Sequence, residues 1–203
     1  MPPSRTSSRA PTGATPREAI LSAATELFGE NGYTGTSMRD IATAVGVLPG
    51  SLYAHIQSKD AVLLEIIEGG VDRFVAAADE IEAQRPPATE ALRLAVRAHL
   101  RIVADNPGRT LIVFHQWRFL TEPHRTRLRE KRRSYEKFFT RAVAAGVASG
   151  EFSADVDVKV AVLGLLGALN WTPEWYSPDG PATPDELAAK LADALLGGLR
   201  ARS

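Results

Sequence analysis

The sequence predicts an all-α protein, because apolar residues recur every three or four positions along most of its 203 residues. The apolar–polar alternation of a half-buried strand is missing. Capping residues and prolines stand where helices would begin, and glycines stand where several would end. We therefore expect nine helices, the first three forming one domain and the others a second.

The first two helices have clear ends. We expect the first to run from Thr15, a capping residue followed by proline, to the Asn31–Gly32 pair. The second begins at Thr36 or Ser37, either of which can cap it. Gly46 ends this helix, because glycine adopts the left-handed conformation without strain.

A short third helix over residues 49–55 leads into a long fourth one, which Ser58 caps and which reaches about Gln84. The fourth helix contains Gly69 and Gly70, and each glycine costs about 1 kcal/mol relative to alanine in a helix interior. The pair indicates either close packing against another helix or a soft point between two halves of the chain. The pattern does not decide between the two.

Five more helices follow a proline-rich break at residues 85–87. Each has an apolar stripe, and most have a capping residue at the start. We expect them to start at Thr89, at Asn106, at about Pro123, at about Val158 and at Thr183. The helix that starts at about Pro123 should end at Ser149–Gly150, and the one that starts at about Val158 should end at Trp171.

Composition excludes several kinds of protein. No cysteine is present, so disulfides, thiolate metal sites and cysteine nucleophiles are excluded, and the chain suits a reducing compartment such as the cytoplasm. The 24 Lys and Arg balance 24 Asp and Glu, so any nucleic acid must be held by placed charges. The longest apolar run, residues 160–169, is far shorter than the roughly 20 residues of a membrane helix. We expect no metal, no cofactor and no membrane partner.

Residues 1–14 contain Pro, Ser, Gly and Arg without an apolar segment, and we expect them to form a flexible basic arm. Arg5, Arg9 and Arg17 carry the charge of this end of the chain, with no acid among them. They can follow a phosphate backbone or simply keep the tail soluble, and we favour the second reading. Residues 15–62 then form the three-helix domain and residues 63–203 the second domain.

The three short helices describe a helix-turn-helix, in which the later helix enters the major groove of DNA. The small residues Pro49, Gly50 and Ser51 allow the backbone to approach base edges, and Ser51 can hydrogen-bond to a base or a phosphate. Leu52 and Ile56 lie four positions apart and should hold this helix against the first two.

Polar residues occupy the other face of the same helix. Tyr53 and His55 can donate to phosphate oxygens, and Lys59 adds a cation in the first turn of the next helix. Alternatively, Tyr53 packs into the core and His55 is an ordinary surface histidine. Because all of these residues occur together, we favour the DNA-facing interpretation.

The span from Thr15 to about Leu64, with TSMRDIATAVGV followed by GSLYAHIQSKD, resembles the DNA-binding domain of TetR-family transcriptional regulators. The resemblance implies a helical C-terminal domain that binds a small effector and forms a homodimer. It also implies the DNA-facing set Thr36 or Ser37, Arg39, Pro49, Gly50, Ser51, Tyr53, His55 and Lys59. Arg39 can equally be an ordinary solvated charge.

Leu48 departs from the family pattern, which usually has Ser or Thr at this position as the cap of the recognition helix. Loss of such a cap typically costs about 1 kcal/mol. Either packing of Leu48 compensates for the loss, or the helix starts differently.

The second domain contains apolar and aromatic residues suited to line an effector cavity, although any helical core needs the same types. The candidates are Phe74, Val96, His99, Val103, Phe114, His115, Trp117, Arg118, Phe138, Phe139 and Trp171.

The segment NWTPEWYSPDGPATPDEL resembles C-terminal domains of family members that respond to acyl-CoA or steroid-derived CoA thioesters. Residues 118–141 carry nine cations against three acids. This excess can hold the phosphates of a CoA while the acyl chain enters the cavity. A solvated helix face is the alternative, and we favour it.

The helix at residues 160–169 is apolar all round, so it must be covered on opposite faces. A second copy of the chain can supply one cover, together with the leucine stripe of the last helix, in a four-helix, two-fold interface. The interface candidates are Val162, Leu165, Leu166, Leu169, Leu191, Leu195 and Leu199. A helix buried in the protomer's own core is the alternative.

Our main hypothesis is a homodimeric repressor that a small apolar effector, such as an acyl-CoA, releases from a palindromic operator. One alternative is a regulator of a drug-efflux gene that binds a hydrophobic drug. Another is an enzyme that acts on a thioester through His99 and His115, but no metal-binding, phosphate-loop or nucleophile-elbow motif supports catalysis. A third is a protein-binding module whose helix-turn-helix has lost its DNA role.

Overall fold

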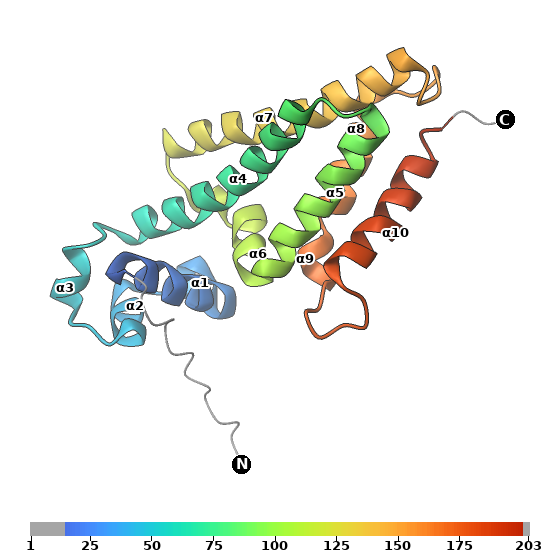
Figure 1. The fold of residues 1–203 in the computed structure, drawn as a ribbon. Helices are drawn as coiled ribbons and strands as arrows, with labels where there is room; N and C mark the ends of the chain where they lie inside the picture. The colour runs from blue at the N-terminus through green and yellow to red at the C-terminus, as the bar shows by residue number, and fades with distance from the viewer. Residues whose placement is uncertain (1–14, 201–203) are drawn as a thin grey trace.

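The computed structural model describes residues 15–200, and every regular element in that part of the chain is a helix (Figure 1). The all-α prediction is thereby confirmed. Each predicted helix has a counterpart, and two short elements add to them, the 3₁₀ helix η1 (Trp117–Phe119) and α9 (Thr172–Trp175). The predicted arm, with Arg5 and Arg9, lies outside the described residues.

Three helices form the N-terminal part: α1 (Pro16–Gly35), α2 (Met38–Val45) and α3 (Pro49–Tyr53). Thr15 caps α1 as predicted, and Gly32, at φ 72°, breaks its regular conformation near the predicted end. Ser37 caps α2, since its hydroxyl accepts from the backbone N–H of Asp40. Gly46 ends α2 in the left-handed conformation, at φ 77°.

The long helix α4 (Lys59–Gln84) begins at the predicted cap, Ser58, and continues through Gly69 and Gly70. A Cβ atom on Gly70 would lie 2.3 Å from Cγ2 of Val113, which belongs to the sixth helix of the chain. Only a residue without a side chain lets the two helices come this close. Of the two interpretations of the glycine pair, this contact supports close packing.

The second half of the described chain contains α5 (Ala88–Asp105), α6 (Pro107–His115), η1, α7 (His124–Ser149), α8 (Val158–Asn170), α9 and α10 (Pro184–Gly197). Asn106 caps α6 and Thr183 caps α10, as predicted, while Asp157 caps α8. α5 starts one residue before Thr89, after Pro87, which offers no side-chain cap; the carboxylate of Glu151 instead accepts from the backbone N–H groups of Ala88 and Thr89.

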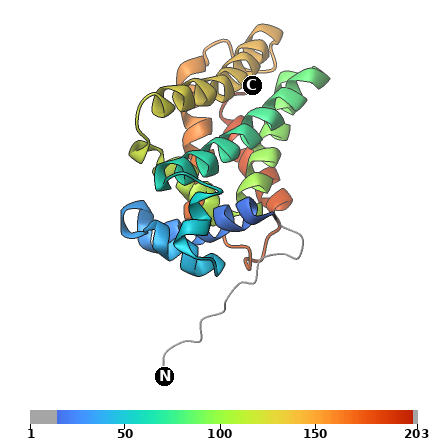
Figure 2. The same ribbon diagram turned by 90° about the vertical axis from the view of Figure 1, so that its left-hand side faces the viewer.

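Two clusters of buried residues divide the interior. The first joins α1, α2, α3 and the start of α4, and includes Phe28, Ile41 and Leu52, but it also takes in Ile112 and Val113 of α6. The second joins α5, α7, α8, α10 and the end of α4. Figure 2 shows α4 crossing between the small helices below it and α7 above it. The N-terminal helices therefore share their core with α6.

Ion pairs connect α4 and α7 along their length. Arg127 pairs with Glu68, Lys131 Nζ lies 2.7 Å from Asp72 Oδ1, and Arg141 Nε lies 2.7 Å from Glu82 Oε1. All three pairs reach solvent, where a single ion pair contributes roughly 0–1 kcal/mol. Their main effect here is that acidic groups of α4 neutralise part of the basic excess of residues 118–141.

Candidate nucleic-acid interface and effector cavity

The recognition helix α3 presents one apolar and one polar face. Leu52 and Ile56 are buried against α1 and α2, as the sequence predicts. On the other face Ser51 and His55 are exposed, and Tyr53 is 52% exposed. These side chains are free to meet a ligand outside the protomer.

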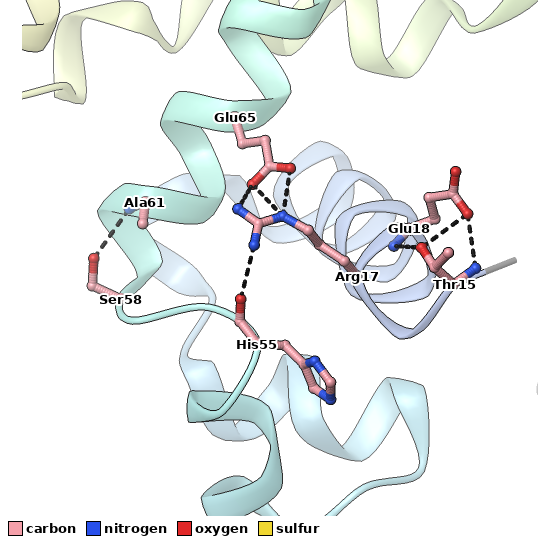
Figure 3. A network of polar contacts seen from close by, with 7 residues as sticks. All are labelled: Thr15, Arg17, Glu18, His55, Ser58, Ala61 and Glu65. Atoms are coloured by element: carbon pink, nitrogen blue, oxygen red, sulfur yellow. Dashed lines mark hydrogen bonds and ion pairs between the residues drawn. The ribbon is translucent and has the colours of Figure 1, made fainter.

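Arg17 holds the end of α3 in place. Two N–H groups of its guanidinium donate to the carboxylate of Glu65, at 2.8 Å from Nε to Oε1 and 2.7 Å from Nη2 to Oε2 (Figure 3). A third N–H donates to the carbonyl oxygen of His55 at 3.1 Å. Glu65 raises the pKa of Arg17 further above its usual value, through this hydrogen bonding and its charge. Arg17 thus connects α1, α4 and the residue that follows the recognition helix, and its charge is already engaged.

Lys59 is only partly exposed and is bound within the protomer. Its ammonium donates to the carbonyl oxygens of Tyr33 and Thr36, both at 2.8 Å, and lies 4.2 Å from the centroid of the Tyr33 ring. We predicted Lys59 as a DNA-facing cation, but in the structure it connects α4 to the α1–α2 turn.

Thr36 is another predicted DNA contact that the structure places inside. It is 2% exposed, and its hydroxyl donates to the carbonyl oxygens of Leu27 and Gly32. Its neighbour Ser37 is exposed, although its hydroxyl is engaged in capping α2, and Arg39 is exposed. Thr36 and Lys59 thus complete the domain's own hydrogen bonds, whereas Ser37 and Arg39 lie at its surface.

Leu48 occupies the N-cap position of α3 without a side-chain cap, and it is 77% exposed. Packing therefore does not compensate for the missing cap. Pro49 and Gly50 form the first turn as predicted, and both are exposed. The backbone carbonyl of Leu48 still accepts the first helical bond, from Ser51 N at 2.9 Å.

A cavity of about 140 Å³ lies among α4, α6, α7 and α8. Apolar and aromatic side chains dominate its wall, and one arginine, one glutamate and one asparagine are the polar members. The lining residues are Val71, Phe74, Phe114, Arg132, Tyr135, Glu136, Leu166 and Asn170.

Only Phe74 and Phe114 of the predicted cavity residues line this space. The core instead contains four of them: Val96, Val103, Phe138 and Phe139. In a sequence, an apolar residue of the core cannot be distinguished from one that lines a cavity. His115, Arg118 and Trp171 are exposed, whereas Trp117 is half-buried on η1. The sequence offered no signal that singled out Arg132 among nine cations.

His99 lies directly behind the cavity wall. Its Nδ1 shares a hydrogen bond with the Tyr135 hydroxyl at 3.1 Å, and its ring lies 4.7 Å from the Phe74 ring centroid to centroid. Burial lowers the pKa of His99 to about 3 and raises the pKa of Tyr135. Both groups are therefore neutral at physiological pH and act as hydrogen-bonding groups rather than charges.

Arg132 brings a positive charge to the cavity. Its guanidinium lies 5.3 Å from the centroid of the Trp117 ring, and its Nη1 is buried without a hydrogen-bond partner. Burial lowers the pKa of Arg132, although an arginine stays charged. A buried donor without a partner is costly, so an acceptor supplied by a ligand would stabilise this site.

The two histidines of the enzyme alternative lie in different environments. His99 is buried beside Tyr135, whereas His115 is exposed at the end of α6, where its Nε2 lies 2.9 Å from Glu174 Oε1. Among residues 15–200 no cluster of His, Asp and Glu suited to a metal ion is found. No helix in the same range is long and apolar enough to cross a membrane.

The outer face of α8 differs from the predicted interface. Val162, Leu165 and Leu169 are buried in the protomer's own core, and Leu166 lines the cavity. Leu191, Leu195 and Leu199 of the C-terminal segment pack against the same core. The exposed residues of α8 are Lys159, Val160, Leu163, Gly164 and Gly167, with Trp171 just after them.

The fold and this surface define a helix-turn-helix regulator whose later helices, together with α4, line a cavity. Two family models match the chain: "Bacterial regulatory proteins, tetR family" over residues 20–66, and "Tetracyclin repressor-like, C-terminal domain" over residues 85–199. The protein therefore belongs to the tetR family of bacterial transcriptional regulators.

Three relatives are informative. The transcriptional repressor KstR2 of Rhodococcus jostii is 31% identical over 184 residues, which cover 90% of each chain. The fatty acid metabolism regulator protein of Bacillus subtilis is 23% identical, covering 89% of this chain and 93% of its own. The structure of AibR in complex with isovaleryl coenzyme A and operator DNA matches with a TM-score of 0.77 and 29% identity, covering 90% of this chain and 97% of that one.

Proposed function

We propose that the protein is a dimeric repressor that leaves its operator when an acyl-CoA or a related apolar acid derivative enters the cavity among α4, α6, α7 and α8. The observation that carries this proposal is the aromatic cavity lined in part by Arg132, whose buried Nη1 has no hydrogen-bond partner. Such a site suits a ligand with an apolar body and an oxygen acceptor, for example a thioester carbonyl or a carboxylate.

The relatives support the same ligand class. AibR binds isovaleryl coenzyme A and operator DNA, and the B. subtilis relative regulates fatty acid metabolism. The cavity of about 140 Å³ is smaller than the roughly 300–1,000 Å³ of typical ligand sites. An acyl chain would therefore have to displace side chains such as Phe114, and this displacement can change the protein's shape.

A direct route connects the cavity to the DNA-binding helices. Phe114 lines the cavity on α6, and two residues later Gln116 donates from Nε2 to the carbonyl oxygen of Phe28 in α1, at 3.0 Å. A shift of α6 would thus pull on α1, which Arg17 in turn connects to the recognition helix. In the dimer, such a shift would change the spacing of the two recognition helices, which should be about 34–36 Å for successive major grooves.

The outer face of α8 supports the dimer. Val160 and Leu163 are exposed there, and Cβ atoms built on Gly164 and Gly167 would meet nothing within 4 Å. A second copy of the chain can approach the helix closely over these glycines and cover its apolar residues.

Glu136 supports a second candidate function, because its carboxylate also lines the cavity and would suit a cationic hydrophobic drug. Thermal-shift measurements with acyl-CoAs, free CoA, fatty acids and cationic drugs separate the two proposals, since a binder raises the melting temperature according to its affinity.

We expect acyl-CoAs to raise the melting temperature and to release the protein from its operator in gel shifts. Arg132→Gln should lose this response, whereas Arg133→Gln, at the exposed neighbouring position, should retain it. Stabilisation by cationic drugs alone would favour the second candidate. Equal binding to every DNA fragment would refute sequence-specific regulation altogether.

A further inference from the structure

Leu48 and Val47 form an exposed apolar patch on the DNA-binding surface. Leu48 is 77% exposed and Val47 is 38% exposed. The interior of the helix-turn-helix is complete without them, because Ile41, Leu52 and Ile56 fill it. The patch therefore has no packing role within the protomer.

The cap position makes the exposed leucine more informative. Ser37 and Ser58 cap the helices on either side, and each hydroxyl accepts a hydrogen bond from the backbone N–H three residues later. At Leu48 no side chain caps α3. A large apolar residue thus stands where a hydroxyl would stabilise the helix and where solvent exposure is unfavourable. Such a residue indicates a contact made outside the protomer.

The position of the patch decides what that contact is. Leu48 directly precedes Pro49 and stands three residues before Ser51, at the end of the recognition helix that meets base edges in this class of fold. In the major groove, the 5-methyl group of thymine is the apolar group that a base pair presents, and an apolar side chain packs against it. Each half-site would place one such methyl group against one Leu48.

We propose that Leu48, with Val47 beside it, determines operator specificity by packing against a thymine 5-methyl group in each half-site. The contact would remove apolar surface of both partners from water, and it would be lost when the methyl group alone is removed. The inference rests on the proposed function, because it requires that α3 enters the major groove of a specific operator.

The test uses the full-length protein and a duplex selected from a randomised pool by the wild type. Each thymine of the half-sites is replaced in turn, symmetrically, by deoxyuridine, which differs only by the missing methyl group. At one thymine position, the replacement by deoxyuridine should weaken wild-type binding by about threefold or more for each half-site, as expected for one buried methyl group. Leu48→Ser and Leu48→Ala should lose this penalty at the same position.

Three results would overturn the inference. If deoxyuridine is neutral at every position, or if the penalty persists in both Leu48 variants, the methyl contact is absent. If the wild type enriches no sequence, the proposed function itself fails, which is a different outcome from a specific operator without a methyl effect. Both variants replace an exposed residue, and Leu48→Ser adds a cap, so thermal unfolding should show that they fold.

Discussion

The ammonium of Lys59 lies 4.2 Å from the centroid of the Tyr33 ring while it donates to the Tyr33 carbonyl oxygen at 2.8 Å. One side chain at the start of α4 thus binds both the ring and the backbone of a residue near the end of α1. Together with its bond to the Thr36 carbonyl oxygen, this contact joins α4 to the helix-turn-helix.

Lys59→Ala should therefore act through the fold. Hydrogen bonds from a charged group typically contribute about 1.5–3 kcal/mol, so urea unfolding should show a loss of this order. Operator affinity should fall, but the slope of log K against log salt should stay unchanged, because a phosphate contact is not what is lost. Lys137→Ala, at an exposed lysine of α7, is the control. A shallower salt slope with unchanged stability would show instead that Lys59 binds phosphate.

The two glycines of α4 should respond differently to alanine. At Gly70 a Cβ atom would lie 2.3 Å from Val113 Cγ2, so Gly70→Ala should lower the free energy of unfolding by about 1–3 kcal/mol. At Gly69 the nearest atom is Nη2 of Arg109, at 3.0 Å, and a flexible side chain can move. Gly69→Ala should be neutral or stabilising by up to about 1 kcal/mol. Equal effects at the two positions would show that α6 does not restrict α4.

His99 should make the stability depend on pH. The folded protein keeps His99 neutral down to a pKa of about 3, whereas an unfolded chain protonates it below about 6.5. The unfolded state therefore binds more protons between these values, and stability is lost as the pH falls from about 6.5 towards 3.

Urea unfolding at pH 7.5 and 5.0 checks this sign. The free energy of unfolding should fall by about 1–2 kcal/mol more in wild type than in His99→Gln over this interval, since one titrating group changes it by at most about 1.4 kcal/mol per pH unit. His55→Gln, at an exposed histidine, leaves His99 in place and serves as the control. The idea fails if wild type and His99→Gln lose stability in parallel.

Gln116 should transmit the effector signal. Gln116→Leu removes the donor to the Phe28 carbonyl oxygen but leaves the cavity lining intact. We expect acyl-CoA to stabilise this variant as it stabilises wild type, while the concentration needed to release the operator rises severalfold. Gel shifts and thermal shifts on the same sample measure both quantities. Unchanged release would mean that another contact couples the two sites.

Dimer formation should depend on the outer face of α8. Leu163 is 58% exposed there, and Leu163→Arg would bury a charge if a second copy covers this face. Sedimentation should then show a monomer and operator binding should weaken strongly. Ser22→Arg, at an exposed position of α1, should stay dimeric. A dimeric Leu163→Arg variant would place the interface elsewhere.

Much of this architecture could be predicted because helix ends depend on local chemistry. Thr15, Ser37 and Thr183 are capping residues at predicted helix starts and do cap helices, and the inward face of α3 follows from Leu52 and Ile56. These features involve residues within one turn of each other, where sequence alone carries the geometry.

Other features depend on contacts across the fold. Thr36 and Lys59 are polar and precede or begin a helix, so nothing local distinguishes a DNA contact from a bond to a distant carbonyl oxygen. α8 is apolar all round, and periodicity therefore cannot tell its inner face from its outer one. Arg132 becomes special only because Trp117 and the cavity surround it, while other cations of α7 pair with α4.

The N-terminal helices share their core with Ile112 and Val113 of α6. Chimeric regulators that exchange only residues 15–66 between relatives would therefore set Phe28 and its neighbours against a foreign α6. Such hybrids should recover native stability only when the matching α6 segment is transplanted as well. For engineering, the exchangeable unit is thus discontinuous in sequence, and a biosensor assembled from two regulators has to respect it.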